Sequence, residues 1–263
     1  MKNEIELRNR ATTGETLAVQ AGARIRQYFF GATTSVQTKS DGSPVTAADR
    51  ETEQFLRERL KQFFPDDTVI GEEFETYNGS SPYTWVLDPI DGTKSFVAGV
   101  PLFTVLIAVL YEGNPVTGII HNPITHETVA ATTGYGCTYN GRPTSVRDCK
   151  GLEEALVLVT DPADLARRNP EFSEVLNREA GQIRTWADGY GYLMVASGRA
   201  DAMLDPIMNA WDVAAMKPII TEAGGSWSDF AGNPTGLGES GIAAASAVHL
   251  EILSWLTGHH GNA

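Results

Sequence analysis

The segment Trp85–Thr93, which reads WVLDPIDGT, constrains the fold of this chain more than any other. Its apolar start predicts a short strand over 84–87 that ends at Asp88 and the following proline. The proline fixes the backbone between Asp88 and Asp91, and the glycine after them permits a tight turn. Such a turn can direct both carboxylates and the Ile90 carbonyl into one pocket, where Mg²⁺ prefers oxygen ligands. The same dipeptides also form ordinary turns, so the segment alone leaves a purely structural role open.

Further acidic residues stand at the ends of other apolar elements. Glu72 follows an apolar pair, and Asp49 and Asp212 each open a predicted helix. Thr46 suits the N-cap of the first of these helices, with Asp49 as its capping-box acid. Taken singly, Glu72 suits a solvated loop and the two aspartates suit helix starts, where an acid complements the macrodipole. Together with the pair in 85–93, however, they form a set that a fold can bring to one place.

The residues that could bind zinc are few. Cys137 and Cys149 are unpatterned, which predicts ordinary thiols rather than ligands. His121 and His126 flank a proline turn and are expected at the surface, and the histidines at 259–260 belong to the tail. The chain therefore offers few ligands for zinc. Its candidate ligands are oxygens, which indicates Mg²⁺, with Mn²⁺ as a substitute.

Hydrophobic periodicity predicts an α+β chain. Helices are expected over the stretch that contains Leu17 and Phe29, from Thr46 through Leu60, and over 171–180, 190–197, 211–223 and from 246 to about 256. Strands are expected over 102–110, 116–120 and 127–132 as an antiparallel meander, and over 156–159, 202–204 and 242–245. The implied architecture is a set of mixed sheets layered with helices, with approximate lobes over 1–150 and 151–263.

The net charge of −13 over 263 residues disfavours a nucleic-acid partner, because phosphate backbones need clustered basic side chains. It would also repel a free phosphate ester, so a protein of this charge that handles phosphate needs local positive charge, of which bound metal is the usual source. No stretch reaches the length of a membrane span, and the charged N-terminus lacks a leader-like apolar run. A cytoplasmic location is the expectation.

These motifs together resemble the inositol-monophosphatase superfamily. Residues 85–93 look like its first signature, and residues 211–215 with 222–225 look like its second. Lys39, residues 45–49 and residues 71–73 match its other landmarks in order, so the resemblance covers the chain from about residue 18 to 256. It implies a layered α-β-α-β-α sandwich of the inositol monophosphatase and fructose-1,6-bisphosphatase type, and a homodimer.

The resemblance also implies the roles of individual residues. Glu72, Asp88 and the Ile90 carbonyl would hold a first metal ion, and Asp88, Asp91 and Asp212 a second. A third would lie near Glu72 with mostly water ligands. The attacking water would be oriented by Asp49 and Thr93, and the phosphate would be bound by the backbone amides of Gly92 and Thr93 at a helix start, where anions bind readily.

The segment before Asp212 resembles that of the histidinol-phosphate phosphatases. It runs Leu204-Asp205-Pro206 and then Met-Asn-Ala-Trp-Asp. Because histidinol phosphate carries an ammonium and an imidazole, Asp188 and Asp205 are suitable charge partners, and Tyr190 or Trp186 could stack with a cation or ring. Tyr190 could equally be a core aromatic, and Asp205 could cap the turn at the proline.

The predicted function is Mg²⁺-dependent hydrolysis of a phosphomonoester by activated water, with histidinol phosphate as the expected substrate. The alternatives within this class are an inositol-1-monophosphatase and a broad sugar-phosphate or nucleotide 3′-phosphatase. The alternative outside it is an idle, metal-dependent binding or regulatory subunit. The presence of the complete acidic set, from Asp49 to Asp212, weighs against that last reading.

Overall fold

The computed structural model describes residues 2–31, 36–38, 44–186 and 188–258. Lys39, most of the loop at 38–44 and the histidines at 259–260 lie outside these ranges.

A seven-stranded sheet forms the first half of the molecule. Strands that are consecutive in the sequence are neighbours in this sheet. Every neighbouring pair is antiparallel except the first, β3 with β4. They are β3 (Thr68–Gly71), β4 (Tyr83–Asp91), β5 (Thr104–Tyr111), β6 (Asn114–Asn122), β7 (Glu127–Thr132), β8 (Cys137–Tyr139) and β9 (Arg142–Pro143). The hairpin from β5 to β6 turns at Glu112 and Gly113, both with positive φ, as two-residue hairpin turns require. The predicted meander is confirmed.

A five-stranded sheet forms the second half, in the order β11-β10-β12-β14-β13. Its strands are β10 (Leu156–Val159), β11 (Gln182–Arg184), β12 (Ala202–Asp205), β13 (Ser226–Ser228) and β14 (Gly241–Ala244). The first three are mutually parallel, whereas β14 runs antiparallel to both of its neighbours. A separate antiparallel pair joins β1 (Val36–Thr38) to β2 (Pro44–Thr46).

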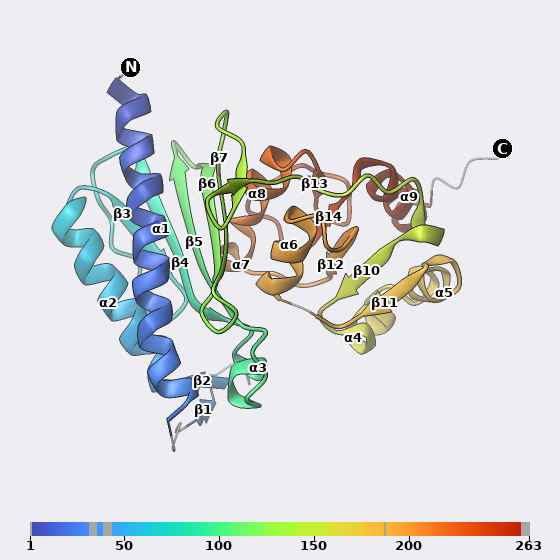
Figure 1. The fold of residues 1–263 in the computed structure, drawn as a ribbon, viewed down its shortest axis with the longest axis horizontal. Helices are drawn as coiled ribbons and strands as arrows, with labels where there is room; N and C mark the ends of the chain where they lie inside the picture. The colour runs from blue at the N-terminus through green and yellow to red at the C-terminus, as the bar shows by residue number, and fades with distance from the viewer. Residues whose placement is uncertain (1, 32–35, 39–43, 187, 259–263) are drawn as a thin grey trace.

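Helices cover both faces of each sheet. The helices are α1 (Lys2–Phe29), α2 (Ala47–Phe63), α3 (Thr93–Val97), α4 (Pro162–Arg168), α5 (Pro170–Glu179), α6 (Gly189–Ala196), α7 (Ala210–Val213), α8 (Met216–Glu222) and α9 (Ser246–Leu256), with a 3₁₀ turn at Leu152–Glu154. Helices α1 and α2 lie outside the first sheet, α6 and α8 lie between the sheets, and α4, α5 and α9 lie outside the second (Figure 1). This is the predicted α-β-α-β-α sandwich.

The two-sided cover explains why the central strands are apolar throughout. In β5 every residue from Thr104 to Leu110 is buried, because α1 packs on one face and α6 on the other. The core between the sheets joins residues from both halves of the chain, such as Leu106 of β5 and Met203 of β12. The division into lobes near residue 150 stays a prediction.

The helix predicted over 211–223 is wrong in one respect, because it is broken into α7 and α8. Pro218 has no N–H to donate to the carbonyl of Ala214, and its ring crowds that carbonyl, so the helix is interrupted after Val213. The strand predicted to end at 87 runs on to Asp91. Helix α4 and the short strands β1, β2, β3, β8, β9, β11 and β13 were not predicted.

His121 is also a correction, because it is buried rather than at the surface. Its side chain is 5% exposed, and its Nδ1 lies 2.8 Å from the hydroxyl of Thr128. Burial lowers the pKa of His121 to about 4, so the ring is neutral at pH 7. His126 is exposed as predicted, and Cys137 and Cys149 are free thiols.

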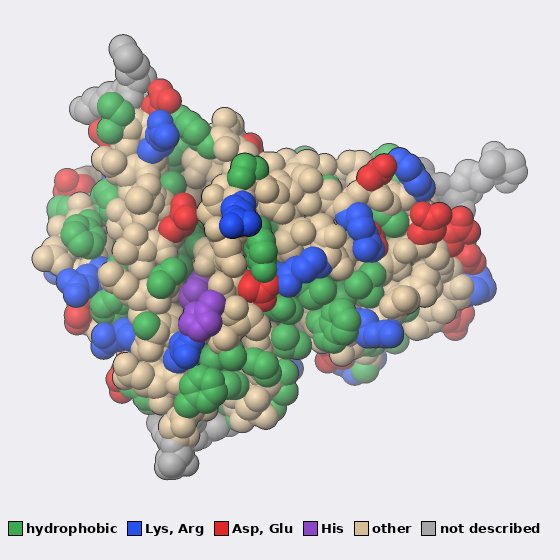
Figure 2. All heavy atoms as spheres, in the orientation of Figure 1, with side chains coloured by type: hydrophobic (Ala, Val, Ile, Leu, Met, Phe, Trp, Pro, Cys, Tyr) green, Lys and Arg blue, Asp and Glu red, His purple; other side chains and the backbone are tan. Residues whose placement is uncertain are grey.

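The outer surface mixes charges of both signs. The face in Figure 2 carries basic and acidic side chains interspersed with apolar ones, and no continuous basic patch that would suit a nucleic acid lies on it. Within the described residues, no helix combines the length and the apolar character needed to cross a bilayer.

We expect Gly118→Ala to destabilise the protein by about 1–3 kcal/mol, because overpacking costs that much. A Cβ at Gly118 in β6 would lie 2.1 Å from the carbonyl oxygen of Ala215, which forces α8 away from the sheet. Denaturant unfolding measures the change. Gly151→Ala is the control, since its Cβ would meet nothing nearer than 3.4 Å. Equal stability of the two variants would contradict this packing.

Candidate functional site

The acids of β4 are positioned by a bulge. Asp88 pairs with Leu106 of β5 but Asp91 pairs with Thr104, so one extra residue lies in β4 between them. Pro89, which has no N–H for a ladder bond, occupies this irregular stretch. Oδ1 of Asp88 accepts a hydrogen bond of 3.0 Å from the Ile90 amide. The local turn that the sequence indicated is therefore present, and it orders the carboxylates.

A cavity of about 470 Å³ opens at this end of β4. It is lined by residues from both halves of the chain: Glu72, Asp88, Ile90, Asp91, Gly92, Thr93, Lys94, Ser95, Thr160, Asp161, Thr185, Asp188, Asn209, Trp211 and Asp212. The structure thus brings all five predicted metal-binding positions to one cavity, together with Thr93, Gly92 and Asp188.

Three of these acids lie close enough to share an ion. One carboxylate oxygen from each of Asp88, Asp91 and Asp212 lies within 4.8 Å of the other two. Burial raises the pKa of Asp88 well above its ordinary value, and the charge of Glu72 raises it further. Burial also raises the pKa of Asp91, followed by the charge of Asp188. Crowded carboxylates of this kind fit a hard divalent cation, which would neutralise their charge and accept their oxygens.

Two of the site's acids also start helices. Asp49 is the N3 residue of α2 and accepts hydrogen bonds from the amide and hydroxyl of Thr46 at 2.8 and 2.5 Å. Asp212 is the N3 residue of α7 and accepts from the amide of Asn209 at 2.7 Å. Both are capping boxes, so the predicted helix-start role holds for both residues. Asp212 also lines the cavity, whereas Asp49 is not among the described residues that line it.

Asp49 is placed beside Thr93. Its side chain is 1% exposed, and the Thr93 hydroxyl lies 3.5 Å from its Oδ1 and 3.0 Å from the Ile90 carbonyl oxygen. Burial raises the pKa of Asp49 to about 6, although the hydrogen bonds from Thr46 oppose the shift. A carboxyl group with this pKa can take up a proton near neutral pH.

Gly92 and Asp188 pack against each other across the cavity wall. Gly92 has φ of 84° at the start of α3, and a Cβ there would lie 2.8 Å from Oδ2 of Asp188. Burial and the charge of Asp212 raise the pKa of Asp188 to about 6, whereas Lys94 lowers it. The amide next to Asp188, that of Gly189, donates to Asp91 and so ties α6 to the end of β4.

Two residues predicted to contact the substrate do not line the cavity. The Tyr190 hydroxyl donates to Oε2 of Glu127 at 3.0 Å, and Glu127 forms an ion pair with Arg199. Asp205 is buried and accepts from the Tyr192 hydroxyl at 3.2 Å. Neither Tyr190 nor Asp205 is among the described residues that line the cavity.

Sequence reasoning missed Thr160, Asp161 and Thr185. These residues follow β10 and β11, whose carboxyl ends meet at the cavity because the two strands are parallel. Asp161 is also the N-cap of α4 and accepts from the Asp164 amide at 2.9 Å. The Asp-Pro pair that opens α4 was the one local signal that could have been used.

We expect Asp88→Asn to stabilise the metal-free protein increasingly as the pH rises. The raised folded-state pKa means that the stability linked to Asp88 is present below its ordinary, unfolded value and is lost as the pH rises through the folded value. The Asp88→Asn variant does not lose stability in this way, because asparagine does not ionise. Thermal unfolding between about pH 5 and about pH 9, with metal chelated, measures the difference between the two proteins.

Some groups make the protein more stable as the pH rises, such as His121 with its lowered pKa. These groups are common to both proteins, so their contributions cancel in the difference in stability. A constant difference across the pH range would contradict the crowding of these carboxylates.

Comparisons with known proteins agree with this geometry. The model of the inositol monophosphatase family matches residues 6–259. A histidinol-phosphatase of Chlorobaculum parvum is 38% identical over 88% of this chain and 89% of its own, and one of Streptomyces coelicolor is 36% identical over 91% and 94%. The solved inositol monophosphatase of Thermotoga maritima superposes with a TM-score of 0.86 at 28% identity, covering 95% of this chain and 97% of its own. The chain therefore belongs to the inositol monophosphatase family and is a metal-dependent phosphomonoesterase.

Proposed function

We propose that this protein hydrolyses L-histidinol phosphate to L-histidinol and phosphate with Mg²⁺ as its metal. The observation that carries the chemistry is the convergence of Asp88, Asp91 and Asp212 in one cavity, which Gly92, Thr93 and Lys94 also line. The substrate is inferred from relatives named histidinol-phosphatase and from the acidic residue Asp188 at the cavity wall.

The donor set fits two or three Mg²⁺ ions, or Mn²⁺ in their place. Glu72, Asp88 and the Ile90 carbonyl are assigned to a first ion, and Asp88, Asp91 and Asp212 to a second. All of these donors are oxygens, and together they line one cavity. When bound, the ions supply positive charge that acidifies the attacking water and neutralises the phosphate and the leaving oxygen.

Asp49 and Thr93 are assigned to the water. The Thr93 hydroxyl lies between the Ile90 carbonyl and Asp49, so it can orient a water molecule and pass a proton toward the carboxylate. Because the pKa of Asp49 is raised to about 6, its carboxylate can hold a proton released at neutral pH.

The phosphate is assigned to the start of α3. The backbone amides of Gly92 and Thr93 begin this short helix, and the exposed Lys94 adds a positive charge to the same corner of the cavity. The positive φ of Gly92 turns the chain there, and any side chain at this position would strike Asp188.

The amine of the substrate is assigned to Asp188. This residue lines the cavity next to the phosphate corner, and its carboxylate can pair with an ammonium group. Trp211, which also lines the cavity, is the aromatic surface available to an imidazole. Asp205 and Tyr190 are assigned a structural role, because neither lines the cavity. Asp205 accepts a hydrogen bond from Tyr192, and Tyr190 donates one to Glu127.

Inositol phosphate hydrolysis is the second candidate. The cavity wall carries Thr160, Thr185 and Asn209, whose hydroxyl and amide groups could bond to sugar hydroxyls. Assembly as a homodimer and a cytoplasmic location remain predictions, and light scattering in solution tests the first.

We expect phosphate release with Mg²⁺ from histidinol phosphate at a kcat/KM well above that from inositol 1-phosphate, fructose 1,6-bisphosphate and adenosine 3′,5′-bisphosphate. EDTA should abolish all of it. Asp88→Asn should lose about a hundredfold to a thousandfold in kcat, because removing one preorganised electrostatic group from a catalytic centre costs that much. Similar low rates on all four esters would reject the substrate, and turnover by Asp88→Asn near that of the wild type would reject the metal assignment.

We expect Asp188→Asn to lower kcat/KM for histidinol phosphate by about tenfold to a hundredfold, since a hydrogen bond to a charged group contributes about 1.5–3 kcal/mol. The value for inositol 1-phosphate should change less, because that ester has no ammonium.

Asp161→Asn serves as the control, since it removes an acid from the same cavity but at the start of α4. An equal fall in kcat/KM for both substrates in Asp188→Asn would mean that this residue does not bind the amine of histidinol phosphate.

A further inference from the structure

The segment that carries Glu72 leaves the sheet immediately before it. Strand β3 ends at Gly71, which lies opposite Leu87 of β4 in the parallel ladder. Glu72 then lines the cavity, and the chain continues without helix or strand through Glu75. The ladder therefore fixes only the residue before Glu72, and what holds the chain after Glu72 decides where its carboxylate lies.

Glu53 of α2 holds the first residue after Glu72. Its side chain is 0% exposed, and its Oε2 accepts a hydrogen bond of 2.8 Å from the Glu73 amide. Its Oε1 accepts from Nε of Arg57 at 2.7 Å. A buried carboxylate needs such partners, because an unpaired one is strongly destabilising.

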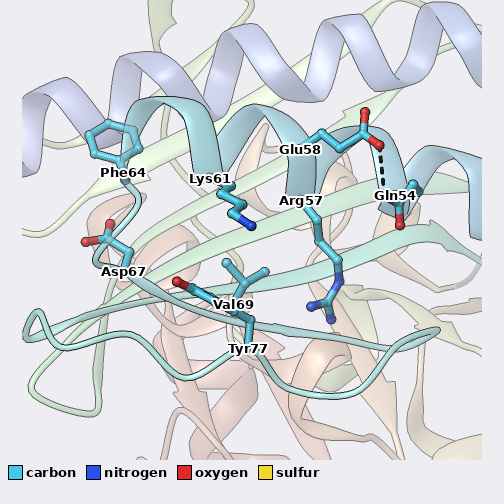
Figure 3. Close-up of a pocket in the computed structure, with 8 residues that line it drawn as sticks. All are labelled: Gln54, Arg57, Glu58, Lys61, Phe64, Asp67, Val69 and Tyr77. Carbon is cyan, nitrogen blue, oxygen red and sulfur yellow. Dashed lines mark hydrogen bonds between the residues drawn. The ribbon is translucent and has the colours of Figure 1, made fainter.

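Arg57 holds the next two residues. Its Nη2 donates to the Phe74 carbonyl at 3.0 Å and its Nη1 to the Glu75 carbonyl at 3.1 Å, while the guanidinium lies 5.8 Å from the Phe74 ring centroid. Figure 3 shows Arg57 extending from α2 toward the chain that it bonds, at the edge of a cavity that Lys61 and Tyr77 also line. The planar guanidinium is suited to two carbonyls at once.

Gly71 leaves the space that the Glu53 carboxylate occupies. A Cβ at this position would lie 2.1 Å from Oε1 of Glu53, so only glycine leaves room for the buried carboxylate. Asp49, Glu53 and Arg57 are spaced four residues apart and so share one face of α2. This face therefore presents Asp49 to Thr93, which lines the cavity, and, one and two turns later, two side chains that bond the Glu72 segment.

We propose that Glu53 and Arg57 form a clamp, bonded to residues 73–75, that positions Glu72 for a divalent cation. This inference rests on the proposed metal-dependent function and deepens it, because neither residue touches the ion or the substrate. The clamp sets metal affinity rather than the chemical step, since it orders the segment into its ligating position before the cation arrives.

The test compares Arg57→Ala with Lys61→Ala by calorimetric titration of the substrate-free protein with MgCl₂. Lys61 has the same charge, lies on the same helix and lines the same cavity, and within the described chain it has no hydrogen bond to residues 73–75. We expect Arg57→Ala to weaken Mg²⁺ binding by about tenfold, the lower end of what residues that orient metal ligands contribute. Lys61→Ala should bind like the wild type, and Arg57→Lys should fall between.

Two further readouts separate positioning from general damage. At saturating Mg²⁺, kcat of Arg57→Ala should stay within about twofold of the wild type while the half-saturating Mg²⁺ concentration rises. Limited proteolysis between residues 72 and 80 should be faster in the metal-free variant, and excess Mg²⁺ should remove the difference. Gly71→Ala, which displaces Glu53 without removing any charge, should reproduce the loss of affinity.

Mg²⁺ binding by Arg57→Ala equal to that of the wild type, or an equal loss in Lys61→Ala, would overturn the clamp. A wild-type protein that binds Mg²⁺ but prefers another phosphate ester would reject the proposed substrate and leave the clamp standing. A wild type that binds no Mg²⁺ would overturn both.

Discussion

Mutual repulsion among closely spaced carboxylates is the interaction on which the rest of this structure depends. One oxygen from each of Asp88, Asp91 and Asp212 lies within 4.8 Å of the others; Asp88 is buried and the other two are partly buried. Burial and neighbouring charge raise the pKa values of Asp88 and Asp91, which is the energetic sign of that crowding. A divalent cation relieves the repulsion, and it also supplies the positive charge that a protein of net charge −13 needs in order to bind a phosphate ester.

Some of the acids at the site also stabilise the helices that position them. Asp49 and Asp212 each complete a capping box, so the same carboxylate that faces the site satisfies backbone donors at a helix start. The bulge in β4 separates Asp88 from Asp91 by one extra residue, and α6 is tied to Asp91 through the Gly189 amide. Because α6 lies between the two sheets, both halves of the chain must be folded before the cavity exists.

Features encoded by neighbouring residues could be predicted from the sequence. The turn at Asp88–Gly92, the capping box from Thr46 to Asp49 and the β5–β6 hairpin all depend on contacts within a few residues. The break before α8 is equally local, because Pro218 marks it, but the predicted helix over 211–223 ran through it without using that signal. The fold class and the family followed from the order of the motifs rather than from any one of them.

Features that depend on distant contacts could not be predicted. Thr160 and Thr185 reach the cavity only because β10 and β11 are parallel neighbours, and β11 has just three residues to signal its presence. Tyr190 has an aromatic side chain suited to stacking, but its partner is Glu127, far away in the sequence. Glu53 resembles a solvated helix acid in the sequence, and only the packing of the segment after β3 buries it.

The most direct test of this account is the number of protons released when Mg²⁺ binds, measured by calorimetry in buffers of different ionisation enthalpy. Carboxyl groups whose pKa values are raised by burial and neighbouring charge must give up protons to a cation, so protons should be released on binding, and fewer should be released as the pH rises. Mg²⁺ binding without proton release at any pH, or no binding at millimolar Mg²⁺, would contradict the claim that crowded carboxylates form the metal centre.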